Sequence, residues 1–406
     1  MITLLAVLAV SAPSIPARGA GATALTSLIV ATSRGESVIP ISQERGVPSL
    51  AAPDLTRVLP LTAEVKPDWA LVTFAGQPFS FLLDAPVFLH GGRLIPLAGG
   101  AYVVRDTLFL PLQWLTDYVP STLTEGYRYD ALAGRFEEVA VTPVIKPRPA
   151  PTPPPRPSAL LPAGVLRYPH TVVVDAGHGG DDPGNPGLHF PGNLREKDVT
   201  LTVAKLLRGE LRKRGIDVVM TRTKDTLIAL ADRGRYCTAE CDLFLSIHVN
   251  SMPRHSGFES ASGIETYFLA AARTADEQRV AKMENDALRY DTNSGADHGD
   301  ALQFILKDLQ TNEYLRESAL LAALIQRRAG QVHPGGDRGV SQAGFMVLTT
   351  ARRPAVLVET GFSTNPSDGR FLTSSAGQER LAQSIADAVV EYFQHYESKV
   401  AAGGEP

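Results

Sequence analysis

Short continuous runs of apolar residues recur in the second half of the chain, and each is bounded by glycine, proline or polar residues. Three of these runs end in a histidine or a glutamate and occupy residues 172–178, 242–248 and 355–359. Runs of this length between turn signals are typical of strands that are buried on both faces. They predict an α/β domain with a mostly parallel or mixed sheet flanked by helices.

An amphipathic helix is expected after the first of these strands. Apolar residues fall at helical spacing from Val199 to Leu211, and Gly215 is expected to end the helix. A further strand is predicted at 216–221.

The first half of the chain has shorter runs in which apolar and polar residues alternate. These runs lie at 70–74, 79–83, 93–97, 102–104 and 108–112, with glycine pairs at 91–92 and 99–100 that mark turns. A short helix is expected near 113–118. The pattern predicts a small β-rich domain at about 30–142, which resembles the domain first named from the N-terminus of copper amine oxidases. That resemblance implies a binding or localising module, and His90 is the one histidine in the region.

A proline-rich segment separates the two halves. Nine of the twenty residues from 143 to 162 are proline, and the segment carries three basic residues and no acidic one. Such a segment extends as a semi-rigid spacer of roughly 3 Å per residue and does not pack a core. We therefore expect a linker at 143–165 and a second domain, which carries the chemistry, at 170–398.

The start of the chain has features of a sorting signal. An apolar run from Met1 to Val10 is followed by small residues, among them Ala20-Gly21-Ala22, which resembles a signal-peptide cleavage site, although no basic residue precedes the run. We expect a signal peptide at 1–22 and export to the periplasm or the extracellular cell envelope. The alternative is an apolar N-terminus that has no sorting role.

Composition narrows the class of protein further. Charged residues make up 20% and apolar residues 44% of the chain, as in soluble globular proteins, and the net charge of −4 is too small to suggest a nucleic-acid partner. No internal apolar run is long enough to predict a transmembrane segment. The two cysteines, Cys237 and Cys241, are expected to be small buried thiols, with a strained disulfide as the alternative.

The residues that could carry chemistry lie where the predicted strands end. His178, His248 and Glu359 each complete an apolar run, and ligands of α/β sheets bind outside the carboxyl ends of the strands. A carboxylate at the end of an apolar strand is costly unless it is paired or bound to a metal. Glu196 begins the predicted helix, where a carboxylate also favours the positive end of the helix dipole.

Together these four residues suggest a zinc site. Two histidines and one glutamate fill three of the four positions around zinc and leave one for water. A second glutamate that is not a ligand then serves as a general base toward that water. The residues alone leave simpler alternatives open, namely hydrogen-bonded core histidines and a glutamate that stabilises a helix end.

The motifs around these residues closely resemble zinc-dependent N-acetylmuramoyl-L-alanine amidases of the amidase_3 type, which includes bacterial cell-division amidases. The matching stretches are 172–180, 196–198, 221–225, 245–250, 263–268, 342–345 and 358–365. They lie between about Thr171 and Tyr396, over half of the chain. The resemblance implies that His178, Glu196 and His248 bind Zn²⁺ and that Glu359 is the catalytic carboxylate.

The same resemblance implies a reaction and a substrate. The expected reaction is hydrolysis of the bond between N-acetylmuramic acid and L-alanine in peptidoglycan, in the service of wall turnover and daughter-cell separation. Arg222, Arg233 and Asn250 are candidate substrate-binding residues. The two arginines match family motifs and can hold a carboxylate by bidentate bonds, or they can pair with Asp225 or Asp232 instead. We expect a monomer.

A long segment at about 270–308 follows one of the matching stretches. An insertion of this length within a compact domain is often a lid or a partner site, and the division amidases that the chain resembles carry an inhibitory helix here. Glu284 lies in a helical pattern and is the candidate autoinhibitory donor to the zinc, with a solvent-facing charge as the alternative. A protein activator is therefore expected to act on this segment.

Two other classes of function remain as alternatives to the amidase. A secreted zinc peptidase of the carboxypeptidase type would need a pocket for a terminal carboxylate, which the sequence does not locate. An inactive wall-binding protein would be favoured by the loss of a ligand or of the catalytic glutamate, and all four residues are present.

Overall fold

A computed structural model describes residues 26–45, 47–123, 126–131, 133–139, 166–238, 240–291 and 314–403. The predicted signal peptide at 1–22 and the predicted linker at 143–165 lie outside these ranges, as does the later part of the 270–308 segment, from residue 292.

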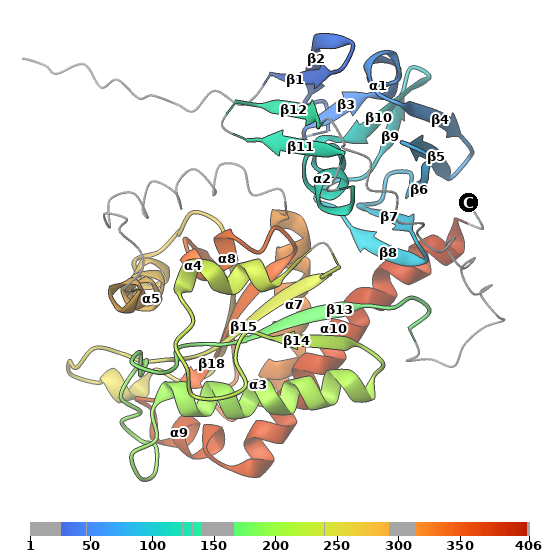
Figure 1. The fold of residues 1–406 in the computed structure, drawn as a ribbon. Helices are drawn as coiled ribbons and strands as arrows, with labels where there is room; N and C mark the ends of the chain where they lie inside the picture. The colour runs from blue at the N-terminus through green and yellow to red at the C-terminus, as the bar shows by residue number, and fades with distance from the viewer. Residues whose placement is uncertain are drawn as a thin grey trace, which may run out of the picture.

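The N-terminal half forms the predicted β-rich domain, which contains two sheets (Figure 1). The seven-stranded sheet contains, in spatial order, β11 (Tyr127–Asp130), β12 (Arg135–Glu138), β1 (Ser27–Thr32), β2 (Gly35–Ser42), β3 (Ser49–Ala51), β10 (Thr107–Pro111) and β9 (Tyr102–Val104). The five-stranded sheet contains β4 (Leu61–Val65), β5 (Trp69–Phe74), β6 (Gln77–Leu82), β7 (Val87–His90) and β8 (Arg93–Pro96). Three helical segments accompany the sheets: α1 (Ala52–Val58), the π-helical turn η1 (Trp114–Tyr118), which lies where a short helix is predicted, and α2 (Val119–Thr122).

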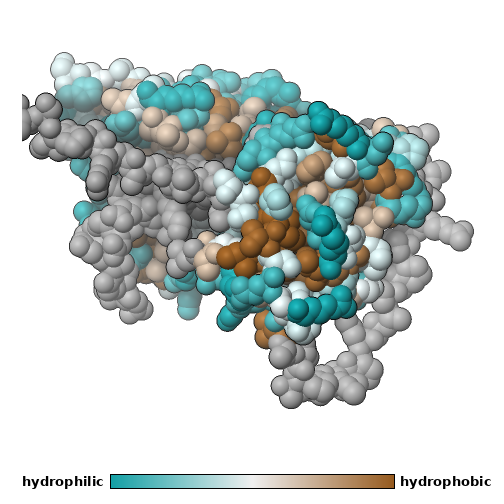
Figure 2. Space-filling view, turned by 90° about the horizontal axis from the view of Figure 1, so that it is seen from above, coloured by the Kyte–Doolittle hydropathy of each residue, from teal (hydrophilic) through white to brown (hydrophobic). Residues whose placement is uncertain are grey.

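The core of this domain is built from aromatic side chains. Phe74, Phe79 and Phe81 each place their ring edge-on or nearly so to the buried indole of Trp114, at centroid distances of 5.7, 5.3 and 5.4 Å. Such pairs stabilise a core beyond their buried area. Figure 2 looks down on the molecule from the side of this domain and shows apolar side chains gathered between polar ones on that face.

The C-terminal half contains one mixed sheet of six strands, as predicted. Its spatial order is β14 (Asp217–Met220), β13 (Thr171–Ala176), β15 (Leu243–Asn250), β18 (Ala355–Phe362), β16 (Ile264–Leu269) and β17 (Asp337–Ala343). The first four strands run parallel, β16 is antiparallel to β18, and β17 is parallel to β16. The carboxyl ends of β13, β15 and β18 therefore meet at one edge of the sheet.

Helices cover both faces of this sheet (Figure 1). One face packs against α3 (Glu196–Lys213), α7 (Leu315–Val332) and α10 (Ser375–Ala402). The other face packs against α4 (Leu230–Arg233), α5 (Ala275–Asn285) and α8 (Met346–Thr349). The remaining helical segments are η2 (Gly234–Tyr236), η3 (Phe258–Ser260), η4 (Asp286–Tyr290) and α9 (Pro366–Leu372). Burial on both faces explains why the strands are continuous apolar runs.

Two strands extend beyond the residues at which the apolar pattern predicts their ends. β15 continues past His248 to Asn250, and β18 continues past Glu359 to Phe362. The backbone stays paired there, with His248 opposite Glu359 and Asn250 opposite Phe362 across a register shift. The apolar run therefore ends at His248 in one strand and at Glu359 in the other, while the backbone pairing between the strands continues for two or three more residues.

The expectation that Cys237 and Cys241 are thiols is wrong, because the structure joins them in a disulfide. Cys237 follows the turn η2 and leaves the helical conformation, with φ −82° and ψ 81°. This turn brings the two Cα atoms to 5.0 Å, which lies within the range that a disulfide requires.

The two domains share one apolar cluster. Trp69 and Leu82 of the N-terminal domain belong to the same buried cluster as Tyr396 and Val400 of α10. The indole nitrogen of Trp69 donates a hydrogen bond to the carbonyl oxygen of Gly403, at 3.0 Å. In Figure 1 the end of α10 accordingly lies beside β7 and β8.

Candidate active site

The loop after β13 brings His178 to the carboxyl edge of the sheet in an uncommon backbone conformation. His178 has φ +62°, in the left-handed region that residues with a side chain seldom adopt, and such strain is concentrated at functional sites. Its neighbour Gly177 lies against the imidazole of His248, because a Cβ atom on Gly177 would come within 2.6 Å of that ring. The glycine therefore permits the close approach of the two histidines, whose ring centroids are 4.9 Å apart.

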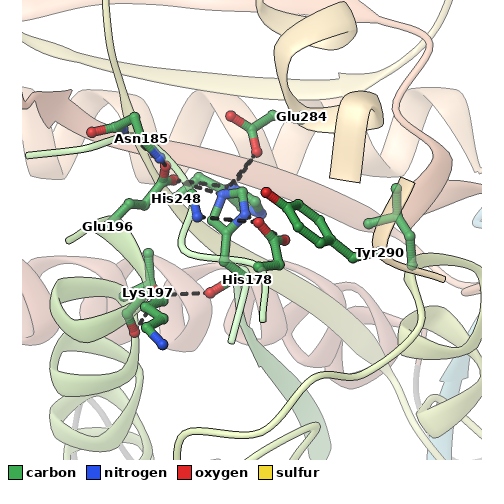
Figure 3. A network of polar contacts seen from close by, with 12 residues as sticks. His178, Asn185, Glu196, Lys197, His248, Glu284 and Tyr290 are labelled. Carbon is green, nitrogen blue, oxygen red and sulfur yellow. Dashed lines mark hydrogen bonds and ion pairs between the residues drawn. The ribbon is translucent and has the colours of Figure 1, made fainter. Parts of the chain in front are cut away.

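Four of the predicted residues converge in this place: His178, Glu196, His248 and Glu284 (Figure 3). One ligand atom from each lies within 4.8 Å of the others, and all four residues are buried. His178 Nε2 is 3.1 Å from Glu196 Oε1 and 3.2 Å from Glu284 Oε2. His248 Nδ1 is 2.7 Å from Glu284 Oε2 and 3.4 Å from Glu196 Oε1.

These close approaches are not hydrogen bonds of normal geometry. His178 Nε2, His248 Nδ1 and both carboxylate oxygens of Glu284 are buried and have no hydrogen-bond partner among the residues that the structure describes. Buried polar atoms without partners are rare in proteins and need an explanation. Imidazole nitrogens and carboxylate oxygens that point toward a common centre form a donor set suited to zinc.

The electrostatics of the cluster also favour a cation. Burial disfavours the charged ring of His178, but the carboxylates of Glu196, Asp182 and Glu284 outweigh burial and raise its pKa well above the ordinary value. Burial opposes protonation of His248 as well, yet Glu284 and Glu196 raise its pKa to about 10. The carboxylates thus stabilise positive charge between them, and a metal ion would supply that charge in place of the two protons.

Outer contacts hold the donor residues in position. Asp182 Oδ2 lies 2.8 Å from His178 Nδ1, the ring nitrogen opposite the cluster. Asn185 donates to Glu196 Oε2 from its backbone and side-chain nitrogens, at 2.9 and 2.8 Å, and the backbone nitrogen of Val249 donates to Glu196 Oε1, at 2.8 Å. Contacts of this kind orient metal ligands.

Sequence reasoning did not find Asp182 or Asn185. Their position could have indicated a role near the donors, because both lie in the glycine-rich loop after His178. Gly184 in this loop has φ +66°, and a Cβ atom there would come within 2.6 Å of Glu196 and 2.7 Å of His178. The loop therefore wraps closely around the donors.

Glu359 lies on β18 directly opposite His248 of the neighbouring strand. Its side chain is fully buried, and neither carboxylate oxygen has a hydrogen-bond partner among the described residues. Burial, and next the negative charge of Glu284, raise the pKa of Glu359 well above its ordinary value. Glu359 is outside the four-residue donor set, so the structure places it beside the candidate metal position and not among the donors.

The two candidate substrate-binding arginines are buried in the supporting loops. Arg222 donates to the carbonyl oxygens of Ala176 and Gly177, and Arg233 donates to those of Ala176 and His178. Arg233 also forms a buried ion pair with Asp175, at 3.0 Å.

The pairings that the sequence suggested for these arginines differ from the observed ones. Asp225 pairs with Lys197, and Asp232 pairs with Arg235. In this structure the two guanidinium groups hold the carboxyl end of β13 and the loop of His178, because carbonyl oxygens lie closer to them in the fold than the acidic residues nearest in sequence.

The third candidate, Asn250, lies at the end of β15 and is fully buried. Its side-chain oxygen accepts hydrogen bonds from Ser251 N, at 2.8 Å, and from Arg279 of α5, at 3.3 Å. Its side-chain nitrogen has no hydrogen-bond partner among the described residues and remains a candidate donor to a substrate.

The helix α5 delivers Glu284 to the cluster. Figure 3 shows Glu284 reaching the histidines from above, with Glu196 to their left and the ring of Tyr290 nearby. Thr274 and Glu277 form a capping box at the start of α5, and Glu277 also accepts a hydrogen bond from the backbone of Gln342, at 3.0 Å. At the other end, Asn285 bonds to the backbones of Gly344 and Met346. The helix is thus fixed at both ends with its glutamate on the cluster.

Comparisons with known proteins agree on one family. The model of the family Amidase_3, described as N-acetylmuramoyl-L-alanine amidase, matches residues 172–391. The chain is 35% identical to N-acetylmuramoyl-L-alanine amidase AmiA of Escherichia coli (strain K12), over 57% of this chain and 78% of that protein. It is 33% identical to N-acetylmuramoyl-L-alanine amidase AmiC of Neisseria meningitidis serogroup B, over 55% of this chain and 52% of that protein.

A solved structure is also similar. The N-acetylmuramoyl-L-alanine amidase from Clostridium difficile 630 aligns with 56% of this chain and 97% of its own, at 28% sequence identity and a TM-score of 0.41.

Proposed function

This chain belongs to the N-acetylmuramoyl-L-alanine amidase family, and from that premise we propose that its buried cluster is a zinc centre serving hydrolysis of peptidoglycan. The enzyme is a hydrolase that acts on the amide bond between N-acetylmuramic acid and L-alanine. The observation that carries the zinc proposal is the convergence of buried, unpartnered imidazole and carboxylate atoms beside a second carboxylate, Glu359.

His178, Glu196 and His248 would hold the zinc ion. When bound, zinc supplies Lewis acidity and makes a coordinated water a nucleophile at neutral pH. Asp182 fixes the orientation of the His178 ring, and Asn185 fixes that of the Glu196 carboxylate. With these supports the donors hold their geometry before substrate arrives.

Glu359 acts as the proton carrier of the reaction. It accepts a proton from the attacking water and delivers it to the nitrogen of the leaving L-alanine. Its buried position opposite His248, with both carboxylate oxygens free of hydrogen bonds to the described residues, suits this exchange. The side-chain nitrogen of Asn250 donates to an oxygen of the substrate.

The amidase reading is favoured over a carboxypeptidase by the site itself. A carboxypeptidase needs a cation close to the metal to hold the terminal carboxylate, and the two arginines buried behind the loop of His178, Arg222 and Arg233, are already bonded to backbone carbonyls and to Asp175. An inactive wall-binding protein gives no reason for a buried glutamate without a partner beside the donors, since such a group costs free energy.

The product of the reaction tests this function. Purified protein loaded with zinc is incubated with muropeptides, and the products are identified by mass spectrometry. Free glycan with an intact stem peptide supports the amidase, whereas release of a terminal amino acid supports the carboxypeptidase. Absence of turnover in every condition, including the Glu284→Ala variant described below, would refute the enzymatic function.

We place the enzyme in the periplasm or the extracellular cell envelope. The disulfide between Cys237 and Cys241 supports export, because disulfides persist in oxidising compartments. Within the described part of the chain, no helix has the length and apolar character needed to span a membrane. Fractionation of cells that finds the mature protein in the cytoplasm alone would overturn this assignment.

Glu284 holds the resting enzyme in a weakly active state. Its carboxylate lies where the water would bind, 2.7 Å from His248 Nδ1 and 3.2 Å from His178 Nε2. A protein activator that withdraws α5 would free this position and shift the population to the active state. The 270–308 segment is therefore the activator's target.

A single substitution tests this regulation. Glu284→Ala should raise basal hydrolysis of purified sacculi by about tenfold or more, because a coupling of 1.4 kcal/mol already corresponds to tenfold. Gln278→Ala, an exposed position on the same helix, is the matched control and should leave the rate unchanged. Equal rates for all three proteins would show that α5 does not restrain the enzyme.

A further inference from the structure

A second buried glutamate lies beside the catalytic one. Glu265 of β16 is directly opposite Glu359 of β18 in the antiparallel register and is 6% exposed. Its Oε1 accepts a hydrogen bond from Ser341 Oγ, at 2.6 Å, and its Oε2 accepts one from Arg338 Nε, at 3.2 Å. Because β16 lies between β18 and β17, Glu265 has Glu359 as its neighbour on one side and Arg338 of the edge strand β17 on the other.

The guanidinium group of Arg338 is oriented but incompletely bonded. It lies 4.9 Å from the ring centroid of Phe362, which is three residues beyond Glu359 on β18. Nε is bonded to Glu265, which leaves the two terminal nitrogens to other partners. Among the described residues, Nη1 reaches Ser262 O at 3.5 Å, and Nη2 reaches Asp276 at 3.7 Å. The terminal edge is therefore available for a two-point contact with a carboxylate.

A carboxylate from α5 already faces this edge of the guanidinium. Asp276 lies in the first turn of α5, the same helix whose Glu284 reaches the histidines. The helix thus presents one carboxylate to Arg338 and another to the candidate zinc position. Eight residues of α-helix separate the two, which corresponds to roughly 12 Å along the axis.

We propose that Arg338 binds a carboxylate of the peptidoglycan stem peptide and so determines which stem peptides the enzyme accepts. This inference rests on the proposed amidase function. In the resting protein Asp276 accepts a hydrogen bond from Arg279 of its own helix through Oδ1, at 2.7 Å, and places Oδ2 3.7 Å from Arg338, next to the position of the substrate carboxylate, while Glu284 lies next to the histidines. Withdrawal of α5 opens both positions together, and Glu265 and Phe362 keep the guanidinium oriented for the incoming peptide.

The spacing predicts where the substrate carboxylate lies. An extended peptide advances about 3.3 to 3.6 Å per residue, so the axial offset of roughly 12 Å between the backbone positions of Asp276 and Glu284 equals the length of three or four residues and sets the first stem positions to test. The ligand is accordingly a free carboxylate on the third or fourth residue of the stem, or one at a similar reach. An amide at that position is uncharged and cannot form the charge-assisted pair.

Pairs of synthetic muropeptides test this recognition. The two members of each pair differ in one carboxylate, free or amidated, at successive residues of the stem. For one pair, the full-length enzyme should show a KM about tenfold lower for the free acid, with kcat little changed, because an ionic hydrogen-bonded contact of about 1.5 kcal/mol gives such a ratio. Measurements in the Glu284→Ala background supply turnover if the unmodified chain is slow.

Variants assign the effect to Arg338. Arg338→Gln should accept both members of that pair with equal KM, and Arg338→Lys should restore part of the preference. Glu265→Gln should weaken the preference in the same direction, because it removes the partner that orients the guanidinium. Arg327→Gln is the matched control, since Arg327 is an exposed arginine on α7 that pairs with Glu391, and it should keep the full preference.

Failure of this inference is distinct from failure of the proposed function. Cleavage of all muropeptides with no preference for a free carboxylate overturns the role of Arg338 and leaves the amidase function standing. A preference that survives in Arg338→Gln also overturns it. If no muropeptide is cleaved, binding of the paired muropeptides to the Glu359→Gln variant by calorimetry decides the question, and equal affinities with and without Arg338→Gln refute the contact.

Discussion

Two buried clusters of histidine and carboxylate lie at opposite edges of the same sheet, and they differ in how their polar atoms are satisfied. The front cluster, at the carboxyl ends of the strands, consists of His178, Glu196, His248, Glu284 and Glu359. The back cluster, at the amino ends, consists of Arg93, His170, Asp242 and Glu397. Both are buried and both hold several charges, so burial and composition do not tell them apart.

Most polar atoms of the back cluster are bonded within the protein, although His170 Nδ1 has no hydrogen-bond partner among the described residues. Asp242 accepts hydrogen bonds from Thr171 N, at 2.7 Å, and from Arg93, at 3.3 Å. Glu397 accepts bonds from the backbone of Arg167 and Tyr168, at 2.9 and 3.0 Å. His170 lies 3.4 Å from Asp242 and 3.2 Å from Glu397.

In the front cluster Glu196 and His178 Nδ1 are bonded, but more of the other polar atoms lack partners. Glu359 and Glu284 have no hydrogen bond to either carboxylate oxygen among the described residues, and His248 has none to either ring nitrogen. The back cluster is therefore held by hydrogen bonds within the protein and joins the two domains through Arg93, whereas the front cluster contains buried atoms whose bonding capacity is open to a metal or a substrate. Substitutions should separate these roles, with changes at the front affecting zinc and rate, and changes at the back affecting stability.

Removal of a front-cluster histidine should have the largest effect. His248→Ala deletes one donor nitrogen, so the protein should lose most of its bound zinc and at least about 10³-fold in activity, since residues that act as one catalytic unit fail together. Metal content by mass spectrometry and muropeptide hydrolysis measure the two losses. Full zinc occupancy in this variant would show that His248 is not a ligand.

Glu359→Gln should separate chemistry from metal binding. The amide keeps the size of the side chain but does not accept the proton, so the rate should fall by about 10² or more while zinc remains bound. Thermal stability should change little, because the carboxylate makes no hydrogen bond with the described residues that the amide would lose. Loss of zinc in this variant would make Glu359 a ligand and exchange its role with that of Glu196.

A smaller effect is expected one contact away from the donors. Asp182→Ala removes the group that faces His178 Nδ1, so zinc affinity should fall by about 10- to 100-fold. Competition with a chelator measures the affinity. Asp181→Ala, at the neighbouring exposed position, is the control. Equal affinities would show that the backbone loop alone orients the ring.

The back cluster should respond in stability and in its pH dependence. Burial disfavours the charged ring of His170, but Asp242 and Glu397 outweigh it and raise its pKa above the ordinary value of 6.5. Its charge therefore stabilises the fold fully below about pH 6.5, and this contribution is lost as the pH rises through the higher folded-state pKa.

His170→Gln tests this dependence. The variant should lose about 1 to 3 kcal/mol of stability in mildly acidic solution and less in alkaline solution, with kcat unchanged. Chemical unfolding at several pH values and a muropeptide assay measure the two properties. A loss of stability that does not vary with pH would mean that packing of the ring on Phe393, at 3.8 Å, matters more than its charge.

The sheet and its candidate donors could be predicted from the sequence, because buried strands and the polar residues at their ends each produce a recognisable local pattern of residues. Strands covered by helices on both faces appear as apolar runs, and His178, His248 and Glu359 break those runs with polar groups. The α/β class, the β-rich first domain and the amidase reaction are confirmed. Glu196 was a candidate from its position at the start of a helix, but the residues alone left a stabilised helix end as an equally simple interpretation, and the resemblance implied its role as a ligand.

The remaining features depend on contacts between distant parts of the chain. Arg93 and Asp242 are 149 residues apart, and no local pattern pairs them. Arg338 reaches Glu265 and Asp276 across three separate elements. From the sequence the disulfide was only the alternative to two thiols, because its geometry comes from a turn that follows η2, whereas a spacing of four suggests a helix.

The long helix α10 extends beyond the region that matches the family and contributes to the packing of both domains. The family match ends at residue 391, within α10, yet the helix continues to Ala402 and its last turns pack against Trp69 and Leu82. The hydrogen bond from Trp69 to Gly403 joins residues 334 positions apart, so the domains can dock only after nearly the whole chain is present. A fragment that keeps the first domain but stops at residue 391, where the family match ends, would retain every front-cluster residue. It would also expose apolar surface on the first domain, and we expect such fragments to aggregate although their catalytic residues are intact.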